Sequence, residues 1–188
     1  MSEATPADSS GADAPRGPVV VLVGPPGSGK TTAGEALARR LGVTFRDTDR
    51  DIEDATGSSI SDLFVRDGEA HFRELEVAAV ERALGDHDGV LALGAGAVLD
   101  ATTRDRLARR QVVYLRVGLA AAMQRLEMNR SRPLLLGNVR SRWQELAAQR
   151  EPLYEQLAVL SVDTDRRSPE EVAEVIAAAV AEARSEGP

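Results

Sequence analysis

A glycine-rich segment from Gly24 to Thr31 carries the residue types that bind phosphate. It reads Gly-Pro-Pro-Gly-Ser-Gly-Lys-Thr and lies between a short apolar run and a segment with helical periodicity. In a strand–turn–helix setting, the N–H groups of such a turn and of the helix start converge on an anion. Lys30 can then reach the β- and γ-phosphates of a nucleotide, and the Thr31 hydroxyl can bind Mg²⁺. The alternative is a plain glycine-rich turn with Lys30 exposed, which leaves the Gly-Lys-Thr ending without a reason.

Two carboxylates, Asp47 and Asp49, follow the extended segment expected at 43–46. Side chains two residues apart on an extended chain point to the same side. Beside a phosphate loop, such a pair suits the water shell of Mg²⁺ and a base directed at a hydroxyl. The plainer interpretation is that one of them caps the next helix, but the pair at this position favours a functional role.

An arginine, Arg73, lies on a helical segment expected at 60–84 with a break near 67–68. Glu69 precedes it by four residues and Glu76 follows by three, so all three share one helix face. The spacing alone favours an ordinary surface cluster of ion pairs, which contributes little to stability.

A basic segment, 129–137, carries two arginines beside Pro133 and a glycine. Pro133 cannot continue a helix, so the segment is expected to be a mobile loop between two helices. It is either a surface connection or a lid, over about 129–139, that brings an arginine to a phosphate.

These groups need a scaffold that brings them together. Strands expected at 18–23, 43–46, 90–93, 112–117 and 159–162 alternate with helical segments. This order predicts an α/β fold with three layers, α/β/α, around a five-stranded parallel sheet. The turn Gly94-Ala95-Gly96 follows the strand at 90–93, at the sheet edge where open α/β folds bind ligands. Its alternative is a tight turn that needs glycine for geometry.

Composition limits the classes of protein to consider. The 188 residues predict one domain at 18–185, preceded by a disordered tail at 1–17 that lacks aliphatic periodicity. A net charge of −7 argues against nucleic-acid and membrane partners. The absence of cysteine excludes disulfides, zinc–cysteine sites and thiol nucleophiles. With no apolar run near about 20 residues and no signal-peptide pattern, we expect a cytoplasmic protein.

The motifs taken together resemble those of the shikimate kinase family. The resemblance spans nearly everything but the tail and rests on segments 24–31, 47–49, 72–76, 93–98, 132–135, 150–154 and 162–164. It implies a P-loop fold like that of nucleoside monophosphate kinases, with a mobile lid. It also implies an ATP-dependent kinase of aromatic amino acid biosynthesis that moves the γ-phosphate of ATP to the 3-hydroxyl of shikimate. Mg²⁺ would be the cofactor, ATP and shikimate the partners, and a monomer the expected state.

The same resemblance implies a role for individual residues. The catalytic residues would be Lys30, Asp49 and Arg132, and Mg²⁺ would be held by Thr31 and Asp47. Shikimate would be bound by Asp49, Arg73, Gly94, Ala95, Gly96 and Arg150, with Glu76 holding Arg73 in place. ATP would be bound by Gly27, Ser28, Gly29, Lys30, Thr31, Thr32, Arg125, Arg132 and Arg167, of which Arg125 and Arg167 would lie near the adenine.

One residue departs from the family pattern, because Ala95 stands where a glycine is usual. Alanine keeps the backbone N–H but adds a methyl group, and it would be strained at positive φ. We expect a slight change in affinity for shikimate. Two rival functions stay open: another small-metabolite kinase, such as a gluconate kinase, and a nucleotide-binding module without turnover.

Overall fold

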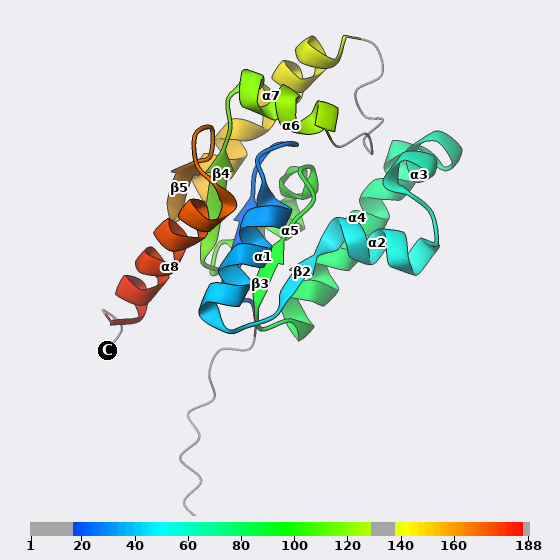
Figure 1. Ribbon diagram of the computed structural model, residues 1–188. Helices are drawn as coiled ribbons and strands as arrows, with labels where there is room; N and C mark the ends of the chain where they lie inside the picture. The colour runs from blue at the N-terminus through cyan, green and yellow to red at the C-terminus, as the bar shows by residue number, and fades with distance from the viewer. Residues whose placement is uncertain (1–16, 129–137, 186–188) are drawn as a thin grey trace, which may run out of the picture.

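The computed structural model describes residues 17–128 and 138–185. Residues 1–16 of the tail expected at 1–17 lie outside the described residues, as do residues 129–137 of the lid expected at about 129–139, with Arg132. Five strands form one parallel sheet: β1 (Val20–Val23), β2 (Phe45–Asp47), β3 (Val90–Ala92), β4 (Val112–Arg116) and β5 (Leu160–Asp163). Their order in space is β2-β3-β1-β4-β5 (Figure 1). The predicted five-stranded parallel sheet is thus confirmed.

Helices cover both faces of this sheet. Helices α1 (Lys30–Leu41) and α8 (Pro169–Ser185) lie on one face, and α4 (Gly68–Asp86), α5 (Ala101–Leu107) and α7 (Val139–Leu157) on the other (Figure 1). The alternation of β1 shows why: Val20 and Leu22 enter one apolar core, while Val21 and Val23 enter the other. A strand buried on both faces needs this continuous apolar sequence.

The remaining elements lie around this sheet. They are α2 (Thr48–Thr56), α3 (Ile60–Arg66), the short 3-10 helix η1 (Ala97–Leu99) and α6 (Leu119–Met128), with α2 and α3 at the right in Figure 1 and α6 at the top. The expected break near 67–68 is confirmed, since α3 ends at Arg66 and α4 begins at Gly68. Pro152 does not interrupt the last long helix before β5, because α7 continues through it.

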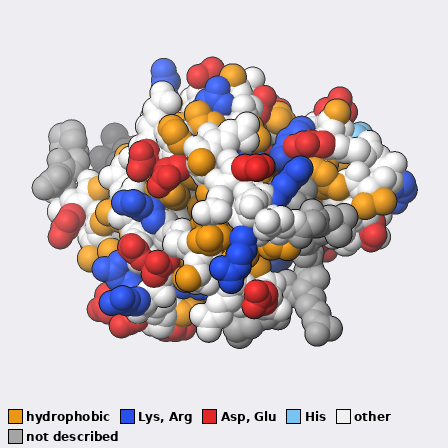
Figure 2. All heavy atoms as spheres, turned by 90° about the horizontal axis from the view of Figure 1, so that it is seen from above, with side chains coloured by type: hydrophobic (Ala, Val, Ile, Leu, Met, Phe, Trp, Pro, Cys, Tyr) orange, Lys and Arg blue, Asp and Glu red, His pale blue; other side chains and the backbone are white. Residues whose placement is uncertain are grey.

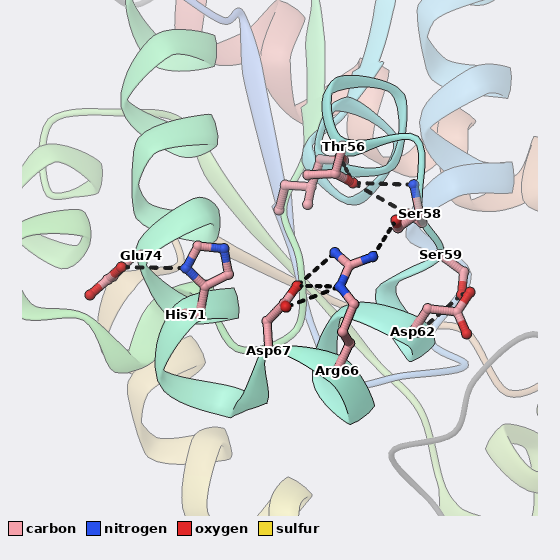
Figure 3. A network of polar contacts seen from close by, with 9 residues as sticks. Thr56, Ser58, Ser59, Asp62, Arg66, Asp67, His71 and Glu74 are labelled. Carbon is pink, nitrogen blue, oxygen red and sulfur yellow. Dashed lines mark hydrogen bonds and ion pairs between the residues drawn. The ribbon is translucent and has the colours of Figure 1, made fainter.

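Helices α2, α3 and α4 form a small unit with its own apolar core of Ile52, Leu63, Phe72 and Ala79. Polar contacts close the junction between these helices (Figure 3). Ser59 Oγ caps α3 by accepting from Asp62 N at 3.1 Å, and Arg66 donates to Asp67 at 2.7 Å. His71 and Glu74 lie 3.7 Å apart on the exposed side. This unit fixes the start of α4, which carries Arg73 and Glu76.

Candidate active site

The predicted phosphate loop connects β1 to α1. Gly24, Gly27 and Gly29 have φ values of 151°, 81° and 86°, which only glycine adopts without strain. A Cβ on Gly24 would also lie 2.5 Å from the Leu115 carbonyl oxygen. The sequence therefore needs glycine at these positions to curl the backbone into an anion-binding concavity.

Lys30 folds back over the loop. Its Nζ donates to the carbonyl oxygens of Gly24 at 2.8 Å and Pro25 at 3.2 Å, and the residue is only 8% exposed. The Ser28 Oγ nearby is buried and has no hydrogen-bond partner in the described part of the chain. One loop thus holds a buried cation and a buried hydroxyl without a partner among the described residues, two groups that suit an anion site.

Arg125, on α6, forms a hydrogen bond with the backbone of the phosphate loop. Its guanidinium donates to Gly27 O at 3.1 Å and to Thr164 Oγ1 at 3.0 Å, and Thr164 Oγ1 in turn donates to Ser28 O at 3.2 Å. The loop after β5 is thereby held against the phosphate loop. The sequence had indicated Arg125 only for the adenine, and these backbone contacts are an addition.

Arg167 lies on the loop that follows β5. It donates to Asp163 O at 2.8 Å and lines an open cavity of about 520 Å³ with Asp163, Asp165 and Arg166. Thr164, which Arg125 contacts, lies between the lining residues Asp163 and Asp165 in sequence.

Hydrogen bonds connect the segment 47–49 to the phosphate loop on one side and to the turn after β3 on the other. Thr31 Oγ1 donates to Asp47 Oδ2 at 2.8 Å, while Asp47 Oδ1 accepts from Asp49 N at 3.0 Å and caps α2. The capping interpretation is therefore correct for Asp47, and its role in the water shell of Mg²⁺ stays a prediction. The expected extended chain ends at Asp47, because Asp49 already lies in α2. Between the acids, the buried Thr48 Oγ1 accepts from Gly94 N at 3.0 Å.

In the turn Gly94-Ala95-Gly96, the two glycines are required because neighbouring side chains leave no room for a Cβ, and not because of a positive φ. A Cβ on Gly94 would lie 2.5 Å from Asp49 Oδ1 and 2.6 Å from Glu76 Oε1, and one on Gly96 would clash with Arg73. No non-glycine residue in the described ranges has positive φ, so the strain considered for Ala95 is absent. Two glycines let three functional side chains approach the backbone, and the alanine between them is accommodated.

Arg73 binds two glutamates that differ in burial. Its Nη1 donates to Glu76 at 2.5 Å and its Nη2 to Glu69 at 3.1 Å, and the Glu76 side chain is 3% exposed against 64% for Glu69. A surface cluster is thus the wrong interpretation for Glu76. Burial raises the pKa of the Glu76 carboxyl, although Arg73 opposes this. Burial also lowers the pKa of Arg73, but the two carboxylates outweigh it and the net pKa is raised.

Arg150, on α7, is a buried cation beside this pair. It is 4% exposed, forms no ion pair with a described residue, and its Nε has no hydrogen-bond partner among them. Burial has the largest effect on the pKa of Arg150 and lowers it. The charge of Arg73 also lowers this pKa, whereas Tyr154 and Glu76 raise it, and the net pKa is lowered. A buried guanidinium without a carboxylate is costly unless a ligand supplies one.

The described site residues thus form one connected edge at the carboxyl ends of the strands. Figure 2, which views the molecule from that side, shows acidic and basic side chains interspersed among the described residues. The described ranges contain no cluster of three or more His, Cys, Asp or Glu residues that could hold a metal ion alone. Nor is any helix within them long and apolar enough to cross a membrane.

Sequence reasoning missed the side chains that hold the backbone of the site: Thr48, Trp143, Tyr154 and Thr164. A signal for two of them was available, because Trp143, Arg150 and Tyr154 are spaced by seven and four residues and share one helix face.

Comparison with known proteins by sequence points to the shikimate kinase family. The sequence model described as shikimate kinase matches residues 26–181. A shikimate kinase of Thermobifida fusca is 52% identical over 160 residues, which are 85% of this chain and 93% of that protein. One from Streptomyces coelicolor is 52% identical over 163 residues, 87% and 95% of the two chains. The solved shikimate kinase from Acinetobacter baumannii in complex with shikimate has a TM-score of 0.85 at 34% identity, covering 89% of this chain and 94% of that one.

Proposed function

We propose a role for each part of the site from one premise: this chain belongs to the shikimate kinase family. It is an ATP-dependent kinase that transfers the γ-phosphate of ATP to the 3-hydroxyl of shikimate. One observation carries the assignment of residues. Arg150 is a buried guanidinium without a carboxylate partner in the described chain, beside Arg73. Shikimate supplies the carboxylate that Arg150 lacks, and Arg73, held by Glu76, is the second cation beside it.

The acceptor is held at both ends. Arg73 and Arg150 bind the carboxylate, because a planar guanidinium matches it with paired hydrogen bonds, and Glu76 fixes Arg73 at 2.5 Å. Asp49, whose Oδ1 lies against Gly94, accepts a hydrogen bond from the 3-hydroxyl. The N–H groups of Ala95 and Gly96 complete this pocket, while Gly94, whose N–H donates to Thr48, leaves room beside it for the Asp49 carboxylate.

The chemical step is an in-line displacement at phosphorus. The 3-hydroxyl oxygen forms a bond to the γ-phosphorus while the bond from that phosphorus to the bridging oxygen of ADP breaks. Asp49 takes the hydroxyl proton as the new bond forms. Phosphoryl transfer needs alignment and charge stabilisation more than covalent help, so the contribution of the protein is position and charge.

The donor phosphates are held by the phosphate loop. Lys30 exchanges the carbonyls of Gly24 and Pro25 for the β- and γ-phosphates, and the loop N–H groups bind the remaining oxygens. The ATP contacts in this part are assigned to Gly27, Ser28, Gly29, Lys30, Thr31 and Thr32. Arg132, outside the described residues, stays assigned to the charge on the transferred group.

The hydroxyl of Thr31 and the carboxylate of Asp47 fit Mg²⁺. They lie 2.8 Å apart and offer oxygen only, and Mg²⁺ commonly takes one or two protein oxygens while phosphates and water supply the rest. Bound there, the ion would offset charge on the β- and γ-phosphates. Thr31 would be a direct ligand, and Asp47 would orient its water shell.

The adenine is assigned to the surface between Arg125 and Arg167. The open cavity of about 520 Å³ that Arg167 lines supports this, as does the contact of Arg125 with Thr164. We propose a cytoplasmic monomer, and light scattering after size-exclusion chromatography tests the monomer.

The test of function is ADP release from Mg-ATP by the purified chain with shikimate, with gluconate, or with neither. We expect strong stimulation by shikimate alone, and loss of that stimulation in Asp49→Asn. Stimulation by gluconate would support the rival kinase instead. ATP binding without stimulation by either compound would support a module without turnover.

A further inference from the structure

Helix α7 touches both turns of the site through aromatic side chains. The indole N–H of Trp143 donates to Pro26 O in the phosphate loop at 2.9 Å, and the Tyr154 hydroxyl donates to Ala95 O in the acceptor turn at 2.6 Å. Both hydrogen bonds are buried. In each case a side chain of α7 satisfies a backbone carbonyl of a turn that binds substrate.

The two donors lie on one face of α7. Trp143 and Tyr154 are eleven residues apart, close to three helical turns, which corresponds to a rise of about 16 Å. Arg150 falls between them on the same face, seven residues after Trp143 and four before Tyr154. These three are the buried residues of α7, so the helix directs one buried stripe at the site.

A hydrogen bond to a carbonyl also fixes an N–H group. The peptide unit is planar, so the orientation of Pro26 C=O sets that of the Gly27 N–H, and Ala95 C=O sets that of the Gly96 N–H. The Gly27 N–H belongs to the phosphate loop and the Gly96 N–H to the acceptor turn. Trp143 and Tyr154 thus orient one binding group on each side of the reacting atoms.

Packing fixes both ends of the stripe. Trp143 lies in an apolar cluster with Ala122 and Met123 of α6, and Tyr154 stacks on Tyr114 of β4 with ring centroids 5.1 Å apart. Close-packed side chains shift little, so the donor groups of Trp143 and Tyr154 stay in place. A movement of either turn would therefore break its hydrogen bond to α7. The hydrogen bonds therefore hold the turns to the helix.

We propose that α7 is a strut that sets the distance between the bound phosphates and the acceptor hydroxyl, with Trp143 and Tyr154 as its positioning residues. Trp143 orients the phosphate loop, and Tyr154 orients the acceptor turn. This inference rests on the proposed function, because it concerns the two substrates of that reaction. It predicts that the two residues act on different substrates although they lie on one helix.

The test compares Trp143→Phe with Tyr154→Phe, which keep a ring and remove one donor each. Calorimetry measures the Kd of a non-hydrolysable Mg-ATP analogue and of shikimate, and steady-state assays give both KM values and kcat. We expect Trp143→Phe to weaken nucleotide binding on the order of fivefold, as for loss of one neutral hydrogen bond, with shikimate affinity nearly unchanged. Tyr154→Phe should do the reverse. The kcat should fall in both variants.

The control is Tyr114→Phe, which removes a buried hydroxyl from the same aromatic pair but not from either turn. We expect it to leave both affinities unchanged. Variants that weaken both substrates equally, or neither, would overturn the strut and leave Trp143 and Tyr154 with a purely structural role. If Trp143→Phe does not fold, Tyr154→Phe alone decides through its effect on shikimate against nucleotide.

Wild-type protein in the same assays separates the two proposals. Suppose that the wild type turns over in a shikimate-dependent way, but Trp143→Phe and Tyr154→Phe do not differ in which substrate they weaken. That result overturns the strut alone. Absence of that turnover overturns the proposed function and the strut with it.

Discussion

The phosphate loop and the acceptor pocket meet at one edge of the sheet, but the chain builds them differently. The loop is one continuous segment, 24–31, and we propose that its backbone makes most of the contacts to phosphate. The acceptor pocket takes side chains from α2, α4 and α7 and places them around the turn after β3. In the proposed function, backbone groups bind the phosphate, which many ligands share, whereas side chains that only the tertiary fold brings together bind the specific acceptor.

Their glycines differ in the same way. Those of the loop are required by positive φ, while Gly94 and Gly96 are required because Asp49, Glu76 and Arg73 lie where a Cβ would be. A position between such glycines is free to carry a methyl group. This is the physical reason that Ala95 fits the turn.

The largest effect is expected from Lys30→Ala. The change removes the charge that bridges the phosphates, and kcat/KM should fall by roughly a thousandfold or more. Because the acceptor pocket is built from other elements, the Kd for shikimate measured by calorimetry should stay within about twofold. Near-normal turnover in this variant would refute the assignment of the phosphate loop.

A smaller effect, on the KM for shikimate, is expected from Glu76→Gln, with Glu69→Gln as its matched control. Both glutamates bind Arg73, but only Glu76 is buried, and removing its charge leaves Arg73 with only the exposed Glu69 as an ionic partner. The KM for shikimate should rise by roughly tenfold to a hundredfold in Glu76→Gln, and hardly in Glu69→Gln, since exposed pairs contribute about 0–1 kcal/mol. Equal effects would remove burial as the cause.

The smallest effect concerns the acceptor turn. Gly96→Ala should displace Arg73 and raise the KM for shikimate about tenfold, with the KM for ATP unchanged. Ala95→Gly should change either value by less than about twofold, because Ala95 is unstrained. Steady-state kinetics checks both, and a larger effect from Ala95→Gly would contradict the spatial account of the glycines.

The sequence predicted most reliably those features that a single continuous segment determines. The strands and the phosphate loop follow from local pattern. The hydrogen bond of Thr31 to Asp47 is a finding of the structure, at the edge where the strand ends meet. Glu69 and Glu76 share a helix face, and spacing alone could not tell which one α2 and β3 would bury. The bond of Trp143 to Pro26 joins residues 117 apart in sequence, and that of Tyr154 to Ala95 residues 59 apart. Such pairs are set by how α7 lies on the sheet, which no local pattern specifies.

The central claim is that the acceptor pocket selects shikimate through its carboxylate. The most direct test compares kcat/KM for shikimate and for its neutral carboxamide in the wild type and in Arg150→Gln. The account predicts that the wild type prefers shikimate by roughly a hundredfold, as expected when a buried charge is left unpaired, and that the variant loses most of this preference. A preference of the same size in Arg150→Gln would contradict it.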